Sequence, residues 1–145
     1  MNINYVQLFV RIAVATAFLS AVADRFGYWG KPGSPNVSWG NWEQFLIYSN
    51  KLNFFVSPEV GELLAIIATV LEIIFALFLV IGYKTKGTSF ASGILLAIFA
   101  VSMTLALGIK STFTYSVWIG SGACFLLCTL NDYRYSLDMY LKKLK

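Results

Sequence analysis

The sequence contains no histidine and only two cysteines. Histidine is the most frequent metal ligand among side chains and the usual imidazole base of enzymes. Without it, the chain cannot build a bis-histidine haem site, an ordinary zinc or copper site, or an imidazole general base. We therefore expect no metal site and no cofactor held by the protein's own residues.

Charged residues are also scarce, because they make up 12% of the chain, whereas hydrophobic residues make up 58% and the mean hydropathy is +0.70. This composition excludes an ordinary soluble domain. A run of about 19 apolar residues crosses the ~30 Å hydrocarbon core of a bilayer as a helix. Runs of comparable length predict four spans, over about residues 5 to 24, 61 to 82, 88 to 108 and 112 to 130.

The four predicted spans account for most of the 145 residues, and the connections after Gly82 and Leu107 are long enough only for helix-to-helix turns. We therefore expect an all-α integral membrane protein, a four-transmembrane-helix bundle that forms a single domain over residues 1 to 145. An outer loop over residues 25 to 58 carries an amphipathic segment. Residues 131 to 145 form an amphipathic tail.

The first predicted span has an alternative interpretation. The stretch "RIAVATAFLSAVAD" also resembles a secretory signal with a small-residue cleavage site after Ala23. However, the residues before Arg11, "YVQLFV", are apolar, whereas a signal peptide begins with a basic region. We expect this segment to be a membrane helix.

The distribution of lysine and arginine predicts the orientation. With four spans, both termini lie on one side of the membrane, together with the turn "GYKTKG". That side carries Lys84, Lys86, Arg134, Lys142, Lys143 and Lys145, and the other side carries Arg25, Lys31, Lys51 and Lys110. We therefore expect both termini to be cytoplasmic. The net charge of +4 favours a membrane surface and does not imply a nucleic-acid partner.

One acidic residue, Glu72, stands near the middle of the second span. A charge at this depth costs roughly 2.5 to 3.5 kcal/mol, so Glu72 should face the bundle interior and be paired or protonated. We predict that Arg11 is its partner. Arg11 lies about 9 Å from the cytoplasmic end of its helix and Glu72 about 15 Å from that end of the next, a difference an arginine side chain can cover. The alternative is that Arg11 reaches the interface and Glu72 is protonated.

The buried pair of Arg11 and Glu72 is the candidate ligand or proton site. Buried pairs serve as often to fix which helix faces which as they do to bind a ligand or transfer a proton. Thr69 lies three residues before Glu72 and could complete the hydrogen bonding of the pair. The secondary candidates are Asp24, Arg25, Thr69, Trp29 and Trp42. The sequence assigns no catalytic residue.

The two cysteines, Cys124 and Cys128, lie one helical turn apart, which invites comparison with paired redox thiols. At this spacing their Cβ atoms are about 5 to 6 Å apart, beyond the ~3.8 Å that a disulfide prefers. Ser116 and Gly120 continue the same four-residue spacing of small residues. We therefore predict that this stripe is a close contact between helices.

The outer loop and the tail both show amphipathic patterns. The loop contains Trp29, Trp39 and Trp42, and "NWEQFLIYSNKLNFFV" predicts a short helix on the outer surface, which we interpret as an interfacial anchor. The alternative is a lid over an opening between helices. The tail, "DYRYSLDMYLKKLK", should lie on the cytoplasmic membrane surface, where a soluble partner is the alternative to lipid.

Several short motifs occur together along nearly the whole chain: "RIA" from Arg11, "ADRF" at the end of the first span, and "LEIIFALFLVIGYKTKG". In these motifs, and in its four predicted helices, the chain resembles the DoxX-like family of small bacterial and archaeal membrane proteins. An arginine early in the first helix, a basic residue at its far end and a glutamate in the second helix recur in that family. Arg11, Arg25 and Glu72 match them, although Arg25 stands where lysine is usual.

The resemblance implies a small multi-pass subunit of an oxidoreductase system in the bacterial inner membrane. It would contact membrane quinone or anchor a redox partner, and at most it would be a non-catalytic or quinone-contacting subunit. Glu72 and Arg11 would then polarise or protonate a quinone-like headgroup, with electrons supplied by a partner. The alternatives are a transport or binding module for a small solute or proton, and an architectural subunit of a larger membrane complex. The expected partners are the lipid bilayer and other protein subunits.

Overall fold

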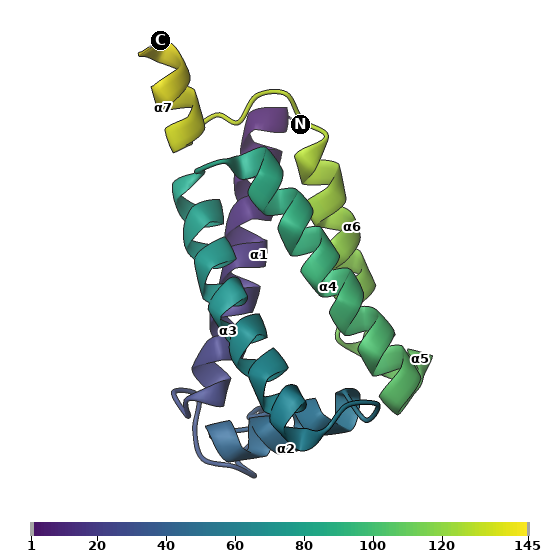
Figure 1. The fold of residues 1–145 in the computed structure, drawn as a ribbon. Coiled ribbons are helices and arrows are strands. Elements are labelled where there is room, and N and C mark those ends of the chain that lie inside the picture. The colour runs from purple at the N-terminus through teal and green to yellow at the C-terminus, as the bar shows by residue number, and fades with distance from the viewer. Residues whose placement is uncertain (1, 145) are drawn as a thin grey trace.

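The computed structural model describes residues 2 to 144; Met1 and Lys145, one of the basic residues assigned to the tail, lie outside this part. Every regular element in the described residues is a helix, so the all-α prediction is confirmed. The helices are α1 (Ile3–Arg25), α2 (Trp42–Leu52), α3 (Pro58–Ile81), α4 (Thr85–Leu107), α5 (Ile109–Thr114), α6 (Val117–Cys128) and α7 (Leu137–Lys143) (Figure 1).

Three of these helices, α1, α3 and α4, are long and apolar enough to cross a membrane. They correspond to the first three predicted spans. Many of their large apolar side chains point outward; for example, Phe9 is 72% exposed, Val70 48% and Leu105 66%. A chain that leaves so much apolar surface uncovered on its long helices has the character of a helical membrane protein.

The fourth predicted span, residues 112 to 130, is not one continuous helix. α5 ends at Thr114, and α6 begins at Val117 after Ser116, whose backbone is left-handed with φ of 55°. A residue in this conformation interrupts the helical hydrogen-bond ladder. α6 alone covers only about 18 Å, less than the ~30 Å hydrocarbon core.

α6 packs closely against α4 through small residues. A Cβ atom added to Gly93 of α4 would lie 2.8 Å from Cε1 of Phe125, and the Ser121 hydroxyl donates to the Gly93 carbonyl at 2.8 Å. Cys124 is fully buried, Cys128 is partly buried, and both thiols are free. The predicted packing role of this stripe is therefore confirmed at Cys124.

α2 lies across one end of the bundle, where α1 ends and α3 begins (Figure 1). We call this the α2 end. The helix begins at Asn41, whose side chain accepts a hydrogen bond from the Gln44 backbone N–H at 2.8 Å. Phe45 and Ser49 are buried toward the bundle, whereas Ile47 is 60% exposed. The predicted amphipathic helix is therefore present, and it covers the end of the bundle.

The opposite end, which we call the α7 end, gathers the start of α1, the turn between α3 and α4, and the tail (Figure 1). Asp138 fastens the tail to that turn, because its carboxylate accepts hydrogen bonds from the backbone N–H groups of Lys84 at 2.7 Å and Thr85 at 2.6 Å. The Asp138 N–H donates to the Gly82 carbonyl at 3.0 Å. The tail is thus held against the bundle, and its last turns form α7.

Candidate functional site

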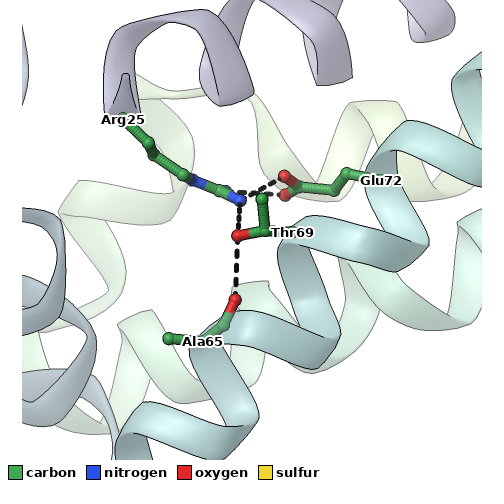
Figure 2. Close-up of polar contacts among 4 residues, drawn as sticks. All are labelled: Arg25, Ala65, Thr69 and Glu72. Atoms are coloured by element: carbon green, nitrogen blue, oxygen red, sulfur yellow. Dashed lines mark hydrogen bonds and ion pairs between the residues drawn. The ribbon is translucent and has the colours of Figure 1, made fainter. Parts of the chain in front are cut away.

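Glu72 is paired with Arg25, the last residue of α1 (Figure 2). Nη2 of Arg25 donates to Oε1 of Glu72 at 2.9 Å, and Nη1 lies 2.6 Å from Oε2. The two side chains are only 4% and 3% exposed. A carboxylate deep in an apolar helix therefore has its counter-charge in direct contact, which offsets part of the cost of burying both groups.

Thr69 completes the polar cluster by serving Arg25 (Figure 2). Its hydroxyl donates to the Ala65 carbonyl at 2.8 Å, so its oxygen is free to accept from Nη1 of Arg25 at 2.6 Å. The sequence correctly placed Thr69 beside the charged site. The member of the pair that Thr69 binds is the arginine.

Aromatic side chains from the α2 end cover the guanidinium. The Arg25 guanidinium carbon lies 4.1 Å from the ring centre of Phe45 and 5.6 Å from that of Trp39. These two rings also meet edge to face, with centres 5.1 Å apart. Cation–π contacts of this kind stabilise a charge that water cannot reach. α2 and the loop before it therefore form one wall of the site.

Asp24 holds the loop that delivers Trp39. Its carboxylate accepts hydrogen bonds from the backbone N–H groups of Ser38 at 2.8 Å and Gly40 at 3.1 Å. Gly40 adopts a φ of 73°, which suits glycine, and a Cβ atom there would collide with the backbone of Pro32. Asp24 lies next to Arg25 in the sequence, but its carboxylate binds the loop. It is thus a positioning residue beside the site.

The two tryptophans predicted as secondary candidates lie in different places. Trp42 stacks on Phe26 with ring centres 5.9 Å apart and contacts Phe45 at 5.3 Å, so it supports the aromatic wall. Trp29 is 61% exposed and donates its indole N–H to the Ser20 carbonyl at 3.1 Å. It therefore lies on the surface of α1, away from the charge pair.

The prediction that Arg11 pairs with Glu72 is wrong. Arg11 is fully buried, but its guanidinium donates to oxygens at the α7 end. The acceptors are the carbonyls of Leu79 at 2.8 Å, Val80 at 3.1 Å, Tyr135 at 3.2 Å and Arg134 at 3.3 Å, and Oε1 of Gln7 at 3.3 Å. Arg11 thus satisfies the last carbonyls of α3 and ties the tail to them.

The direction of helical side chains explains the error. Side chains lean toward the N-terminus of their own helix. Because α1 and α3 run antiparallel, Arg11 leans toward the α7 end and Glu72 toward the α2 end, so the two diverge. Arg25 leans back from the end of α1 and converges on Glu72, which lies about 10 Å along α3 from Leu79, the partner of Arg11. The prediction used only the distance of each residue from the end of its helix and did not take into account the direction in which the side chain points.

Sequence reasoning did not identify Phe45 and Trp39 as site residues. Phe45 lies on the predicted apolar face of α2, which was the only signal, and no pattern fixed what that face covers. The site also contains a donor that is not used: the buried Nε of Arg25 has no hydrogen-bond partner among the described residues. Such a donor is available to an acceptor atom that enters the site.

The chain matched none of the family models, curated proteins or solved structures with which it was compared.

Proposed function

We propose that the protein is a small DoxX-like subunit of a membrane oxidoreductase system, and that it binds a quinone-type headgroup at the α2 end. In this proposal α5 and α6 together complete a fourth crossing of the bacterial inner membrane, with both termini cytoplasmic. The observation that supports it is the buried Arg25–Glu72 pair beneath the aromatic wall of α2.

The chemistry of this cluster suits a quinone. A quinone ring is flat and carries carbonyl oxygens that accept hydrogen bonds, and the Nε of Arg25 is a buried donor that has no partner within residues 2 to 144. Phe45 lies over the guanidinium at the distance at which a stacked ring would sit. A headgroup would therefore displace Phe45 as α2 moves outward, while Arg25 donates to the quinone oxygen. Electrons would come from another subunit.

The near-complete burial of Glu72 favours a second candidate, an architectural subunit. With 2% of its surface exposed, Glu72 lies in a packed setting. The charge pair would then fix how α1 and α3 face each other, and the exposed apolar helix faces would contact neighbouring subunits.

Quinone binding tests the first candidate. The protein is purified in mild detergent and titrated with a short-chain quinone, and the quenching of tryptophan fluorescence is followed, because Trp39 lies beside Arg25. We expect saturable quenching for the wild type. Thr69→Val removes the hydroxyl that orients Arg25 and should weaken the affinity roughly tenfold.

Thr16→Val is the matched control. The Thr16 hydroxyl donates only to carbonyls of its own helix, those of Ile12 and Ala13, on an exposed face of α1. This variant should bind quinone as the wild type does. Equal weakening in both variants, or no saturable quenching in the wild type, would contradict the quinone site. Co-purification of a subunit that is lost in Arg25→Met, without quinone binding, would favour the architectural role.

A further inference from the structure

A pocket of about 600 Å³ lies at the α7 end, far along the bundle from the Arg25–Glu72 pair. The chain that leaves α6 passes beside the start of α1 on its way to α7 (Figure 1). The pocket lies among these three segments, and its wall includes Ile3, Leu130, Met139, Arg134, Lys142 and Lys143. The wall therefore combines apolar side chains, which we call its apolar side, with basic ones, which we call its basic side.

The basic side carries a net positive charge. The one acid in the wall, Asp132, pairs with Lys142 at 2.9 Å, but these side chains are 63% and 75% exposed, so the pairing is weak and screened by solvent. Arg134 and Lys143 have no such partner among the residues that the structure describes, and both also line an adjoining pocket of about 440 Å³. The chemistry of the two pockets therefore favours an anion.

The basic side is held in place by the backbone. The carbonyl of Arg134 accepts hydrogen bonds from Nε2 of Gln7 at 2.6 Å and from Nη1 of Arg11 at 3.3 Å. Both donors are buried in α1. The main chain at Arg134 is thus fixed against the bundle while its side chain reaches the pocket.

Exposed apolar side chains of α1 border both pockets. Ile3 lines the larger pocket, and on another face of α1 Tyr5 stacks on Tyr135, which lines the adjoining pocket, with the exposed Phe9 one turn further along. A molecule that fills both sides of the pocket needs an anionic head at the membrane interface and an apolar chain directed along α1. A free anion or an acidic peptide would use only the basic side.

We propose that this pocket binds the phosphate of an anionic phospholipid, with the acyl chains lying along α1. Arg134 and Lys143 contact the phosphate, and Ile3 and Leu130 contact the first carbons of the acyl chains. The site does not depend on quinone binding at the α2 end.

Native mass spectrometry of the purified protein tests this site, with phosphatidylglycerol and the neutral lipid phosphatidylcholine added at equal concentrations. The wild type should retain one phosphatidylglycerol in preference to phosphatidylcholine. Arg134→Gln/Lys143→Gln should reduce that affinity roughly tenfold or more. Asp132→Asn should increase it, because it frees Lys142.

Lys86→Gln/Lys110→Gln is the matched control, because it removes the same charge from exposed lysines outside the pocket. It should retain phosphatidylglycerol as the wild type does. Equal losses in the two double variants would overturn the site and indicate general attraction to anionic lipid. Tight binding of inorganic phosphate alone would overturn the lipid assignment, as would displacement of the lipid by a short acidic peptide. The increase in Asp132→Asn cannot result from misfolding, so its absence would also count against the proposal.

Discussion

Arg25, the last residue of α1, reaches back along its helix and pairs with Glu72, which lies well inside α3. The contact fastens the end of one membrane helix to the interior of its antiparallel neighbour. At the other end of the same two helices, Arg11 binds the carbonyls of Leu79 and Val80. Two buried arginines thus hold α1 to α3 by different chemistry, one through a carboxylate and one through helix carbonyls.

Phe45→Leu should destabilise the α2 end. The substitution removes the ring that lies 4.1 Å from the Arg25 guanidinium and leaves space in a buried position. We expect a loss of about 1 to 3 kcal/mol in unfolding free energy, measured by denaturation in detergent. Phe54→Leu, at a position 64% exposed, is the control and should change stability by less than about 0.5 kcal/mol. Equal effects would mean that Phe45 does not stabilise the charge.

Arg11→Met should release the tail without disturbing Glu72. It removes the donor that binds the carbonyls of Arg134 and Tyr135. The Arg134 carbonyl keeps its hydrogen bond from Gln7, but the Tyr135 carbonyl loses its donor, which costs roughly 1 to 3 kcal/mol. We expect trypsin to cleave after Arg134 much faster than in the wild type. Lys110→Met provides a control for loss of one positive charge. Unchanged cleavage would show that Arg11 does not hold the tail.

Gly93→Ala should weaken the contact between α4 and α6. A methyl group at Gly93 would lie within 2.8 Å of Phe125, so the ring must shift, at a cost of about 1 to 3 kcal/mol. Gly87→Ala, in the same helix, meets no atom within 4 Å and should be neutral or stabilising by up to about 1 kcal/mol. Comparison of the two thermal midpoints checks this. A stabilising effect of Gly93→Ala would refute the packing described here.

At high pH the ionisation of Tyr133 should detach the tail from the bundle. Its hydroxyl donates to the Leu127 carbonyl at 3.0 Å, and burial, followed by the nearby Cys128 and Asp138, raises the pKa of Tyr133 from 10.0 to about 12. Between these values the detached tyrosine loses its proton while the docked one keeps it, so docking is fully stable below about pH 10 and weakens as the pH rises toward 12.

Tail cleavage by a protease active at high pH measures this effect. The wild type should be cleaved faster as the pH rises from 10 to 12. Tyr133→Phe lacks the ionisable group, so its cleavage should rise less steeply over the same range, although its tail is held less firmly because the hydrogen bond to Leu127 is lost. Parallel pH profiles would rule out Tyr133 as the titrating group.

The sequence predicted the features that follow from the free energy of burying a charge or from the spacing of residues on a helix. Glu72 had to be buried and paired because an isolated charge in an apolar helix is expensive, and it is both. Cys124 was assigned to packing because its spacing does not suit a disulfide, and it is buried with a free thiol. Such conclusions follow from local composition and spacing alone.

The features that depend on direction and on distant contacts were not predictable in the same way. The choice between Arg11 and Arg25 depended on which way each side chain leans, and depth along the helix did not reveal it. The break at Ser116 lies in a stretch without proline, so composition did not indicate it. The position of Phe45 over Arg25 depends on how the loop from Asp24 folds, which involves contacts distant in the sequence.

The proposed site and the contact between α1 and α3 both depend on the pairing of Arg25 with Glu72, and a double-mutant cycle tests this pairing most directly. Unfolding free energies are measured for Arg25→Met, Glu72→Met and the double variant, and for the parallel cycle with Arg11→Met. We predict a coupling of roughly 2 kcal/mol or more between Arg25 and Glu72, and less than about 0.5 kcal/mol between Arg11 and Glu72. A larger coupling of Glu72 to Arg11 than to Arg25 would contradict the pairing of Arg25 with Glu72.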